Sequence, residues 1–536
     1  MTRATVRESF RGVWSILCNA IVRLGGAGPK EPPCMAEVRP VAQQTRLDSR
    51  FAHIKIDTAS RVPKHRQIYA ALRRAILEGR LQAHDSLPST RQLAAELGVS
   101  RNTIMVAYEL LLAEGYVVGR GGAGTFVAHS AVRPQGKPRT VPVEPRPLSQ
   151  AADILRVWRL PELASLARPF RPSSPGFDAF PVAKWSRIVG RLLRDKSARW
   201  TSEGDPRGYF PLRKAIAAHL FAVRTCDCSP DQIVIVSGSQ LALFLSAVLL
   251  MNQDDAVWVE EPGYPHARLT FRVRSSRVIP VPTSDAGIDI DAGKSLSANP
   301  RVIYVTPTHQ WPLGFTMPVQ NRLALLDFAA KSGAWIVEDD YDGDLRYDRK
   351  TYATLFGLGE SHRVLHLGTF TKTMLPGLRI GFIVLPADLV DSFVAGRQIL
   401  DRFPNTISQA ALAEFLESGA YARHIYDMQT LYLERHQLLR ERITKQLAGF
   451  LHARNAQTGT FTVTELTGGV DDVALAAALK KEGFDSVPLS LAYAAPPAKH
   501  GLLLGHAVAR PNEIRKGVNA LERIASTMGS LRRSSP

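Results

Sequence analysis

The sequence predicts an α/β protein in which a large, mostly parallel sheet is sandwiched by helices and follows a small helical unit with a β hairpin. The first indication is a regular alternation of β-branched runs with helical stretches, which is typical of parallel sheets covered by helices. The second is a pair of short helical patterns around a glycine, followed by two short β runs. The third is a proline-rich stretch between these regions, which indicates separate domains.

The chain of 536 residues is too long for one ordinary core, so we expect several domains. Five prolines between residues 129 and 150 predict an extended linker, because proline restrains φ and removes a backbone donor. Near the N-terminus, three arginines precede a short apolar run at 13–22, but no A-x-A cleavage site follows it. The expected division is a disordered extension at 1–58, a small domain at 59–128, the linker at 129–154 and a large domain at 155–530.

The composition indicates an ordinary globular protein with a strongly basic surface. Hydrophobic residues make up 45% of the chain, charged residues 22%, and the net charge is +18. Excess positive charge favours a polyanionic partner such as nucleic acid, although a merely basic surface has the same composition. Cys226 and Cys228 form a C-x-C pair that matches neither a redox nor a zinc spacing, so we predict no metal site and a cytoplasmic location. No segment approaches the ~20 apolar residues of a membrane helix, so no membrane partner is expected.

Three amphipathic helices are predicted in the small domain. Residues 64–79 place apolar side chains four positions apart, on one helical face. Ser89 and Gln92 have the spacing of a capping box at the start of a second helix. Ser100 can cap a third helix at 101–114. The last two helices, joined by a tight turn that contains glycine, form a helix-turn-helix pattern.

The start of the third helix and the hairpin that follows it carry candidate DNA contacts. In a helix-turn-helix, the first residues of the second helix enter the major groove, where arginine can contact guanine and asparagine can contact adenine. Serine, threonine and a basic hairpin tip suit phosphate contacts. The alternative is an ordinary polar helix cap. The candidates are Ser100, Arg101, Asn102, Thr103 and, in the hairpin, Arg120.

The stretch LPSTRQLAAELGVSRNT, followed by AYELLLAEGY, resembles the GntR-type winged helix-turn-helix. This resemblance implies a winged helix over the small domain and binding to double-stranded operator DNA. Ala123 is a small departure, because the wing more often has serine there. In that family, the operator is contacted by the residues that match Arg91, Arg101, Asn102, Thr103 and the glycine-rich wing, including Gly122.

Six apolar, β-branched runs predict the strands of the large sheet. Ligands bind beyond the carboxyl ends of the strands in sheets of this kind, so the residues directly after each run are candidates for a binding site. The runs are 232–236, 256–259, 278–281, 302–305, 334–337 and 364–367.

Candidate ligand contacts follow the first, second and fourth of these runs. A Gly-Ser turn opens a helix after 232–236, and the N–H groups at a helix start suit an anion. Tyr264 could stack on a flat ring, and His309 lies just after 302–305. Each has a structural alternative: an ordinary turn, a buried tyrosine and a structural histidine. The residues of the turn are Gly238, Ser239 and Gln240.

Charged residues after the last two runs suggest a cofactor with a pyridine ring and a phosphate. The acidic cluster after 334–337 needs cations, a metal or water, because ionised neighbours repel. One carboxylate fixed at a strand end can hold the proton of a pyridinium nitrogen. Lys372 can form a Schiff base, unless it is an ordinary surface lysine. Its neighbours Thr369, Thr371 and Arg379 can bind a phosphate.

The stretches QIVIVSGSQLALFL, DAVWVEEPGYPHAR, AWIVEDDYDGDLRY and GTFTKTMLPGLRIGF resemble the MocR-type regulators, which are GntR-type winged helices fused to a fold-type I aminotransferase domain. The resemblance implies pyridoxal 5'-phosphate as the cofactor and a small C-terminal α+β subdomain. It implies that Lys372 forms the Schiff base and Asp339 pairs with the pyridine nitrogen. It implies further that Tyr341 and His309 lie near the ring 3'-oxygen, that Tyr264 stacks on the ring, and that the phosphate is held by Gly238, Ser239, Gln240, Thr369, Thr371 and Arg379.

The sequence also departs from the aminotransferase pattern. The arginine that grips a substrate carboxylate in aminotransferases would fall near 501–506, where this chain has none. The nearest candidates, Arg510 and Lys499, are predicted to lie in loops. Thr371 stands where a serine is common, and residues 311–314 read WPLG where aminotransferases read NPTG. These losses argue against efficient transamination, because a charged clamp orients the substrate for chemistry.

The sequence therefore predicts a transcriptional regulator that senses pyridoxal phosphate itself or a small amine or amino acid. The resemblance implies a head-to-tail homodimer in which each winged helix lies over the large domain of the partner. One alternative is an active aminotransferase with an accessory DNA-binding unit. The other is a DNA-binding protein whose large domain is only a dimerisation scaffold.

Overall fold

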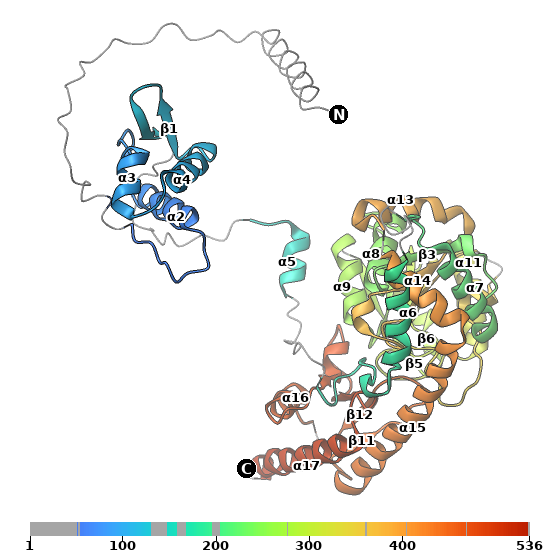
Figure 1. Ribbon diagram of the computed structural model, residues 1–536. Coiled ribbons are helices and arrows are strands. Elements are labelled where there is room, and N and C mark those ends of the chain that lie inside the picture. The colour runs from blue at the N-terminus through green and yellow to red at the C-terminus, as the bar shows by residue number, and fades with distance from the viewer. Residues whose placement is uncertain are drawn as a thin grey trace. The chain divides into compact units, whose positions relative to one another are not determined.

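The structure is a computed structural model, and it describes residues 51, 54–129, 147–157, 168–195, 204–275, 277–359, 362–403, 405–467 and 469–533. The chain forms two compact units, Met1–Arg146 and Pro147–Pro536, which are treated separately below (Figure 1). The predicted extension up to residue 50, with its apolar run, lies outside the described residues, as does most of the predicted linker.

The small unit has the three predicted helices and the predicted hairpin. The hairpin is a two-stranded antiparallel ribbon in which Arg120 pairs with Gly124 across the turn. The first and third helices end within two residues of their predicted ends. The elements are α2 (Lys64–Leu77), α3 (Thr90–Leu97), α4 (Arg101–Ala113), β1 (Val117–Arg120) and β2 (Gly124–Val127).

The core of the small unit begins earlier in the chain than predicted. Apolar side chains spaced four apart on α2 face α4, and Ile68, Leu72 and Ile104 are fully buried. Phe51 and Ile54 belong to the same cluster and are 3% and 5% exposed. The expected extension at 1–58 is therefore wrong for these residues. They carry no periodic pattern of their own and are ordered by tertiary packing.

The end of the predicted linker is helical. Helix α5 (Gln150–Val157) begins inside the expected linker 129–154, crosses the expected boundary at 155 and lies against α9 (Pro265–Arg274). The linker prediction is therefore wrong for 150–154. Its prolines all lie before Leu148, so they do not interrupt the helix.

The large unit is built on an eight-stranded sheet with the order β3-β10-β9-β8-β7-β4-β5-β6. The pairs from β9 to β5 are parallel, whereas β10 is antiparallel to both neighbours and β6 is antiparallel to β5. The predicted mostly parallel sheet is confirmed. The strands are β3 (Ile233–Val236), β4 (Val257–Glu261), β5 (Val278–Ser284), β6 (Gly287–Ile288), β7 (Val302–Val305), β8 (Trp335–Asp340), β9 (Val364–Thr369) and β10 (Gly381–Val384).

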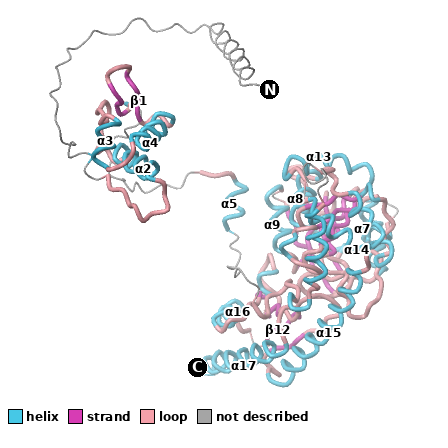
Figure 2. Tube along the Cα trace, in the orientation of Figure 1, coloured by secondary structure: helices cyan, strands magenta, loops and turns pink. Residues whose placement is uncertain are grey.

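Helices cover both faces of this sheet, as the magenta strands within cyan helices show in Figure 2. Strand side chains alternate between the faces, so Tyr304 and Val337 pack toward α8 and α9, while Ile303 and Ile336 pack toward α11. The helices are α6 (Val182–Arg194), α7 (Phe210–Arg224), α8 (Ser239–Leu250), α9, α10 (Ile290–Leu296), α11 (Val319–Ser332), α12 (Leu355–Leu358), α13 (Val390–Asp401) and α14 (Thr406–Glu417).

A small C-terminal α+β subdomain follows the long helix α15 (Ala420–Gln446), which confirms that prediction (Figure 1). Its antiparallel sheet has the order β11-β12-β14-β13 and packs on α17. Over the described part of the chain, no helix combines the length and apolar character needed to cross a membrane. The elements are β11 (Leu451–Ala453), β12 (Thr462–Leu466), α16 (Asp472–Lys481), β13 (Val487–Pro488), β14 (Gly501–Leu504) and α17 (Pro511–Arg533).

Candidate functional site

Hydrogen-bonded caps fix the helix-turn-helix of the small unit. The Ser89 hydroxyl accepts from the Gln92 N–H at 3.2 Å, and the Ser100 hydroxyl accepts from the Thr103 N–H at 3.2 Å. Gly98 ends α3 with a φ of 62°, in the left-handed region that glycine adopts without a Cβ clash. The turn and both helix starts therefore follow from local sequence.

The predicted DNA contacts lie at the surface of the small unit, in two groups: the starts of α3 and α4, and the wing. Arg101 Nε donates to Thr90 Oγ1 at 3.3 Å, so the starts of α3 and α4 lie side by side. In the wing, the Arg120 guanidinium lies 5.0 Å from the centre of the Phe126 ring, and Gly122 makes the turn with a φ of 74°. The exposed predicted residues are Arg91, Ser100, Arg101, Asn102, Arg120 and Gly122, and Thr103 is half-buried.

Asp339 is the buried carboxylate at the carboxyl end of β8. Its Oδ2 accepts from the Tyr304 hydroxyl at 2.9 Å, while its Oδ1 is buried without a hydrogen-bond partner. Burial raises the pKa of Asp339 to about 6, against the hydrogen bond from Tyr304. A buried acceptor without a donor is costly, so this oxygen fits a ligand that brings an N–H group.

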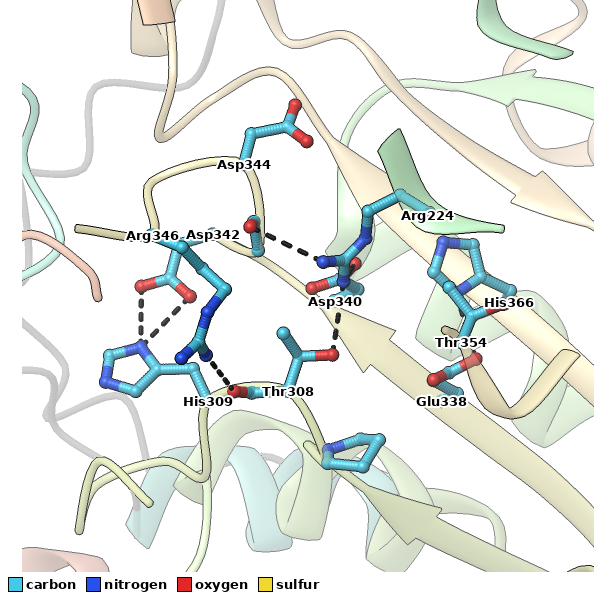
Figure 3. A network of polar contacts seen from close by, with 12 residues as sticks. Arg224, Thr308, His309, Glu338, Asp340, Asp342, Asp344, Arg346, Thr354 and His366 are labelled. Carbon is cyan, nitrogen blue, oxygen red and sulfur yellow. Dashed lines mark hydrogen bonds and ion pairs between the residues drawn. The ribbon is translucent and has the colours of Figure 1, made fainter. Parts of the chain in front are cut away.

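Two acidic residues that follow Asp339 in the chain, Asp340 and Asp342, have partners within the protein, as Figure 3 shows. Asp340 contacts Arg224, which also donates to Thr308 at 3.1 Å. Asp342 lies 2.8 Å from Nδ1 of His309. Side chains of the protein thus contact these two carboxylates, and among the described residues no group of three or more acidic, histidine and cysteine side chains could hold a metal ion.

Glu338 faces away from Asp339 and forms a buried pair with His366. Oε2 of Glu338 lies 3.0 Å from His366 Nδ1, and Oε1 accepts from the Leu355 N–H. Burial lowers the pKa of His366, but the hydrogen bond with Glu338 outweighs it and raises that pKa to about 9. Two adjacent carboxylates thus have separate roles, because successive strand residues point to opposite faces.

Lys372 lies just beyond β9 and shares the electrostatic surroundings of Asp339. Burial lowers the pKa of Lys372, whereas Asp342 and Asp339 raise it. Arg171 and Arg379 lower it further. The net direction is downward, which increases the fraction of unprotonated amine that can act as a nucleophile.

The predicted phosphate residues surround the start of α8. Gly238 precedes α8 with a φ of 93°, and a Cβ there would lie 3.3 Å from the Arg379 guanidinium. Arg379 donates to the Ser237 carbonyl at 2.9 Å, and Thr369 donates to the Thr371 hydroxyl at 2.9 Å. Backbone N–H groups of a helix start, two hydroxyls and a guanidinium together form a suitable phosphate site.

Gln240, one of the predicted residues at this site, has a further partner in the protein. The Gln240 side chain is exposed and donates to Thr270 at 2.6 Å, so its side chain is committed. Ser239 is the first residue of α8, which places its backbone N–H at the helix start. For Gln240, the backbone rather than the side chain is therefore the group that can face a phosphate.

The predicted ring contacts also gather at this edge of the sheet. The Tyr341 hydroxyl lies 3.0 Å from His309 Nδ1, and the two rings are stacked. Tyr264, at the start of α9, packs edge-on against Trp311 with ring centres 5.4 Å apart. Burial raises the pKa of Tyr264, and Asp339 raises it further.

Histidines occupy the region where the carboxylate-gripping arginine would fall. The Ala456 N–H donates to His436 Nε2 at 3.1 Å, which makes His436 Nδ1 the donor to Thr462 at 2.8 Å. Thr462 then donates to His506 Nδ1 at 3.0 Å, and His506 Nε2 donates to Tyr347 at 2.7 Å. This chain holds both histidines neutral, and burial lowers the pKa of His436 to about 4. His506 therefore carries no positive charge for a carboxylate.

Several residues of the site were not predicted from the sequence. Tyr304 and Asp342 hold Asp339 and His309, respectively, and Arg171 acts on Lys372 from the segment before α6. Tyr304 lies inside a strand run, where a tyrosine reads as core. The pairing of β7 with β8 shows that Tyr304 lies on the same face of the sheet as Asp339. Without that pairing, the sequence does not indicate that Tyr304 belongs to the site.

The site fits pyridoxal phosphate on two observations. Asp339 offers a buried oxygen without a partner, and Gly238 leaves a cradle beside Arg379 that a side chain would fill. The fold and the site define a two-part protein that joins a winged helix to an aminotransferase-type domain. Family comparisons agree: residues 186–490 match aminotransferase class I and II, and residues 64–127 match the bacterial regulatory proteins of the gntR family.

Similar proteins include regulators and enzymes. The chain is 36% identical to the probable rhizopine catabolism regulatory protein MocR of Rhizobium meliloti, over 87% of this chain and 94% of the relative. It is 32% identical to the HTH-type transcriptional regulator TauR of Rhodobacter capsulatus, over 76% of this chain and 85% of the relative. The solved structure of LysN, an α-aminoadipate aminotransferase of Thermus thermophilus, has a TM-score of 0.65 at 25% identity and covers 72% of this chain and 98% of its own.

The chain therefore belongs to the MocR-type regulators, in which a gntR-family DNA-binding domain precedes an aminotransferase class I and II domain. This confirms the predicted family, the fold-type I architecture and the class of function, a transcriptional regulator with pyridoxal 5'-phosphate as its cofactor.

Proposed function

We propose that this protein binds operator DNA through its winged helix and holds pyridoxal phosphate on Lys372. Its signal is the cofactor itself, or a small amine or amino acid that binds beside it. The observation that carries the proposal is the buried Oδ1 of Asp339, which has no partner and shares its surroundings with Lys372. A ring nitrogen that donates a proton would satisfy this oxygen.

Each remaining site residue has a role in binding the cofactor. When bound, pyridoxal phosphate supplies an aldehyde that condenses with primary amines and a ring that withdraws electrons. Asp339 holds a proton at the ring nitrogen, and Tyr304 orients Asp339. Tyr341 and His309 bind at the 3'-oxygen, and the Tyr264 ring covers one face and excludes water. The phosphate is held by Gly238, Ser239, Gln240, Thr369, Thr371 and Arg379.

The winged helix binds double-stranded DNA through two kinds of contact. Arg101 and Asn102, at the exposed start of α4, read base edges in the major groove. Arg91, Ser100, Thr103, Arg120 and the backbone at Gly122 bind phosphates and set the orientation. The net charge of +18 favours the encounter with DNA.

We propose that the protein works in the cytoplasm as a head-to-tail homodimer. A DNA ligand requires a compartment that contains DNA. The dimer is supported by the family and by exposed apolar side chains on α8 and α13, two helices that contact each other. Ile399 is 86% exposed, and Leu400 and Val248 are 45% and 42% exposed. Occupancy of the cofactor site shifts the dimer between two arrangements that bind DNA with different affinity.

The decisive experiment compares Lys372→Ala with Lys184→Ala, a change of an exposed lysine on α6. The wild type and Lys184→Ala should show the visible absorbance band of lysine-bound pyridoxal phosphate, and Lys372→Ala should lack it. Footprinting upstream of the neighbouring gene should then change with pyridoxal phosphate or candidate amines only in the proteins that show the band. If the wild type and both variants all lacked the band, the result would support the alternative in which the large domain is only a dimerisation scaffold.

The aminotransferase alternative is not favoured. His506 and His436 are neutral and hydrogen-bonded where a carboxylate-binding arginine would be expected. Incubation of the purified protein with amino acids and keto acids should give no steady multiple turnover. Sustained turnover would establish the enzyme instead.

A further inference from the structure

Glu260 is a buried carboxyl group near the carboxyl end of β4 that none of the cofactor contacts uses. Its side chain is buried, with the residue 1% exposed. The preceding residue, Val259, is paired with Tyr304 of β7, so Glu260 leaves the strand on the opposite face of the sheet from Tyr304. Glu260 therefore does not repeat the position of Asp339, although β4 and β8 end at the same edge of the parallel sheet.

Glu260 holds the loop that follows β7 at two points. Its Oε2 accepts from the Thr306 hydroxyl at 2.6 Å and from the Thr306 N–H at 3.2 Å. Nε2 of Gln310 donates to the same oxygen at 3.5 Å. Thr306 and Gln310 lie on either side of His309 in the chain, so Glu260 anchors the loop both before and after this predicted ring contact.

The same loop is bonded to the turn that leads to Tyr264. Gln310 Nε2 also donates to the Pro262 carbonyl at 2.8 Å. The turn is tight, because a Cβ on Gly263 would lie only 2.1 Å from the Glu260 carbonyl oxygen. Tyr264 follows directly, at the start of α9. The contacts of Glu260 and Gln310 therefore join the turn 260–264 to the loop 306–310.

The second oxygen of Glu260 indicates which substitutions preserve these contacts. Oε1 is buried and has no hydrogen-bond partner. Burial raises the pKa of Glu260 to about 7, against the hydrogen bonds from Thr306 and Gln310. A neutral carboxyl group can still accept both bonds from Thr306 through Oε2. Glutamine is therefore a close substitute for Glu260, whereas alanine removes the anchor.

We propose that Glu260 is a positioning residue that holds His309 and Tyr264 in place around the cofactor ring by joining the loop 306–310 to the turn 260–264. The inference rests on the proposed function and adds to it the residue that sets the distance between two ring contacts from different strands. Glu260 acts through these neighbours. Its loss should displace them and leave Lys372, on the loop after β9, able to bind the cofactor.

The test uses full-length protein loaded with pyridoxal phosphate and measures cofactor affinity and the pH midpoint of the visible band. In Glu260→Ala the affinity should fall about tenfold or more. The midpoint should rise, because a displaced His309 no longer stabilises negative charge on the 3'-oxygen. Glu260→Gln should keep both values close to the wild type. Glu417→Ala, a change of an exposed carboxylate on α14, is the control.

A double-mutant cycle separates positioning from a general structural role. If Glu260 acts through His309, Glu260→Ala should not move the pH midpoint further in a protein that already carries His309→Ala. A general loosening of the domain would move the midpoint by the same amount in both backgrounds. That additive result would overturn the role of Glu260.

A milder variant keeps the test decisive if Glu260→Ala does not fold. Thr306→Val removes the hydroxyl that donates to Glu260 and should raise the midpoint by a smaller amount, whereas Thr306→Ser should not. A wild type without the visible band would overturn the proposed function and the role of Glu260 together. A wild type with the band, and a midpoint unchanged in Glu260→Ala or, where that variant does not fold, in Thr306→Val, would overturn the role of Glu260 alone.

Discussion

The two proposed binding surfaces of this protein are built in opposite ways. In the small unit, the residues at the start of α4 are exposed, and their caps and neighbours come from the same short stretch of chain. In the large unit, Asp339 and His309 are buried and are held by Tyr304 and Asp342, about 35 residues away in the chain on other strands or loops. The DNA surface therefore depends on one local motif, whereas the cofactor site depends on the whole sheet.

This difference predicts where function and stability are linked. A change among the exposed DNA contacts should alter binding without altering stability, because surface substitutions usually change it little. A change in the buried polar network should alter both, because it leaves a charge or an acceptor without its partner. The predictions below test this contrast.

The largest effect is expected from breaking the buried pair of His366 and Glu338. His366→Ala leaves the Glu338 carboxylate buried without its cation and should lower the free energy of unfolding of the large unit by about 3–5 kcal/mol. Urea unfolding followed by fluorescence of Trp258 and Trp335 measures this loss. His452→Ala, an exposed change, is the control. A loss below about 1 kcal/mol would show that the buried network is not the source of stability.

The same pair should make the stability of the large unit fall at alkaline pH. The folded-state pKa of His366 is about 9, above its ordinary value of 6.5. Its stabilisation is therefore complete below pH 6.5 and is lost as the pH rises through 9, by up to about 3 kcal/mol. Urea midpoints measured across this range should fall in the wild type and stay nearly flat in His366→Ala. Parallel slopes would assign the titration to another group.

A moderate effect is expected for the carboxylate at the cofactor ring. Asp339→Asn preserves the shape and can still accept from Tyr304, but it removes the charge that holds the ring proton. Cofactor affinity should fall by about 1.5–3 kcal/mol, the range for hydrogen bonds to charged groups. Equilibrium dialysis of pyridoxal phosphate measures it, with Asp327→Asn as an exposed control. Unchanged affinity would mean that the unpartnered oxygen does not meet the ring.

Local sequence was sufficient for the small unit and for most strands of the large one. The strand at 302–305 has its predicted bounds, because it contains no charged residue and the residues on both sides of it are polar. The run at 334–337 ends too early, since β8 continues through Glu338 to Asp340. A strand predicted from apolar residues ends before the first charged residue, here Glu338. In the structure, Glu338 pairs with His366 and Asp340 pairs with Arg224, and neither partner is close to β8 in sequence.

The candidate site shows the same limit. The residues of the family motifs could be named from the sequence, but the residues that position them could not. Tyr304 reads as an ordinary core residue until β7 is paired with β8. Arg171 has no distinguishing pattern in the sequence. Its place beside β14 becomes visible only through the β-bridge between its neighbour Phe170 and Gly505. Both depend on tertiary contacts that no local pattern encodes.

The smallest effect is expected at the wing of the small unit. Arg120 is exposed and lies over Phe126, so Arg120→Ala removes a phosphate contact without opening a cavity. DNA affinity should fall by about 1 kcal/mol or less, equally for operator and unrelated DNA, and the slope of log affinity against log salt should decrease by about 1. Fluorescence anisotropy at several salt concentrations measures both, with Arg423→Ala on the large unit as the control. The thermal midpoint should not move, because the lost contact is with DNA and not with the core. A loss confined to the operator would instead place Arg120 on a base edge, and a fall in the thermal midpoint would contradict the contrast between the two surfaces.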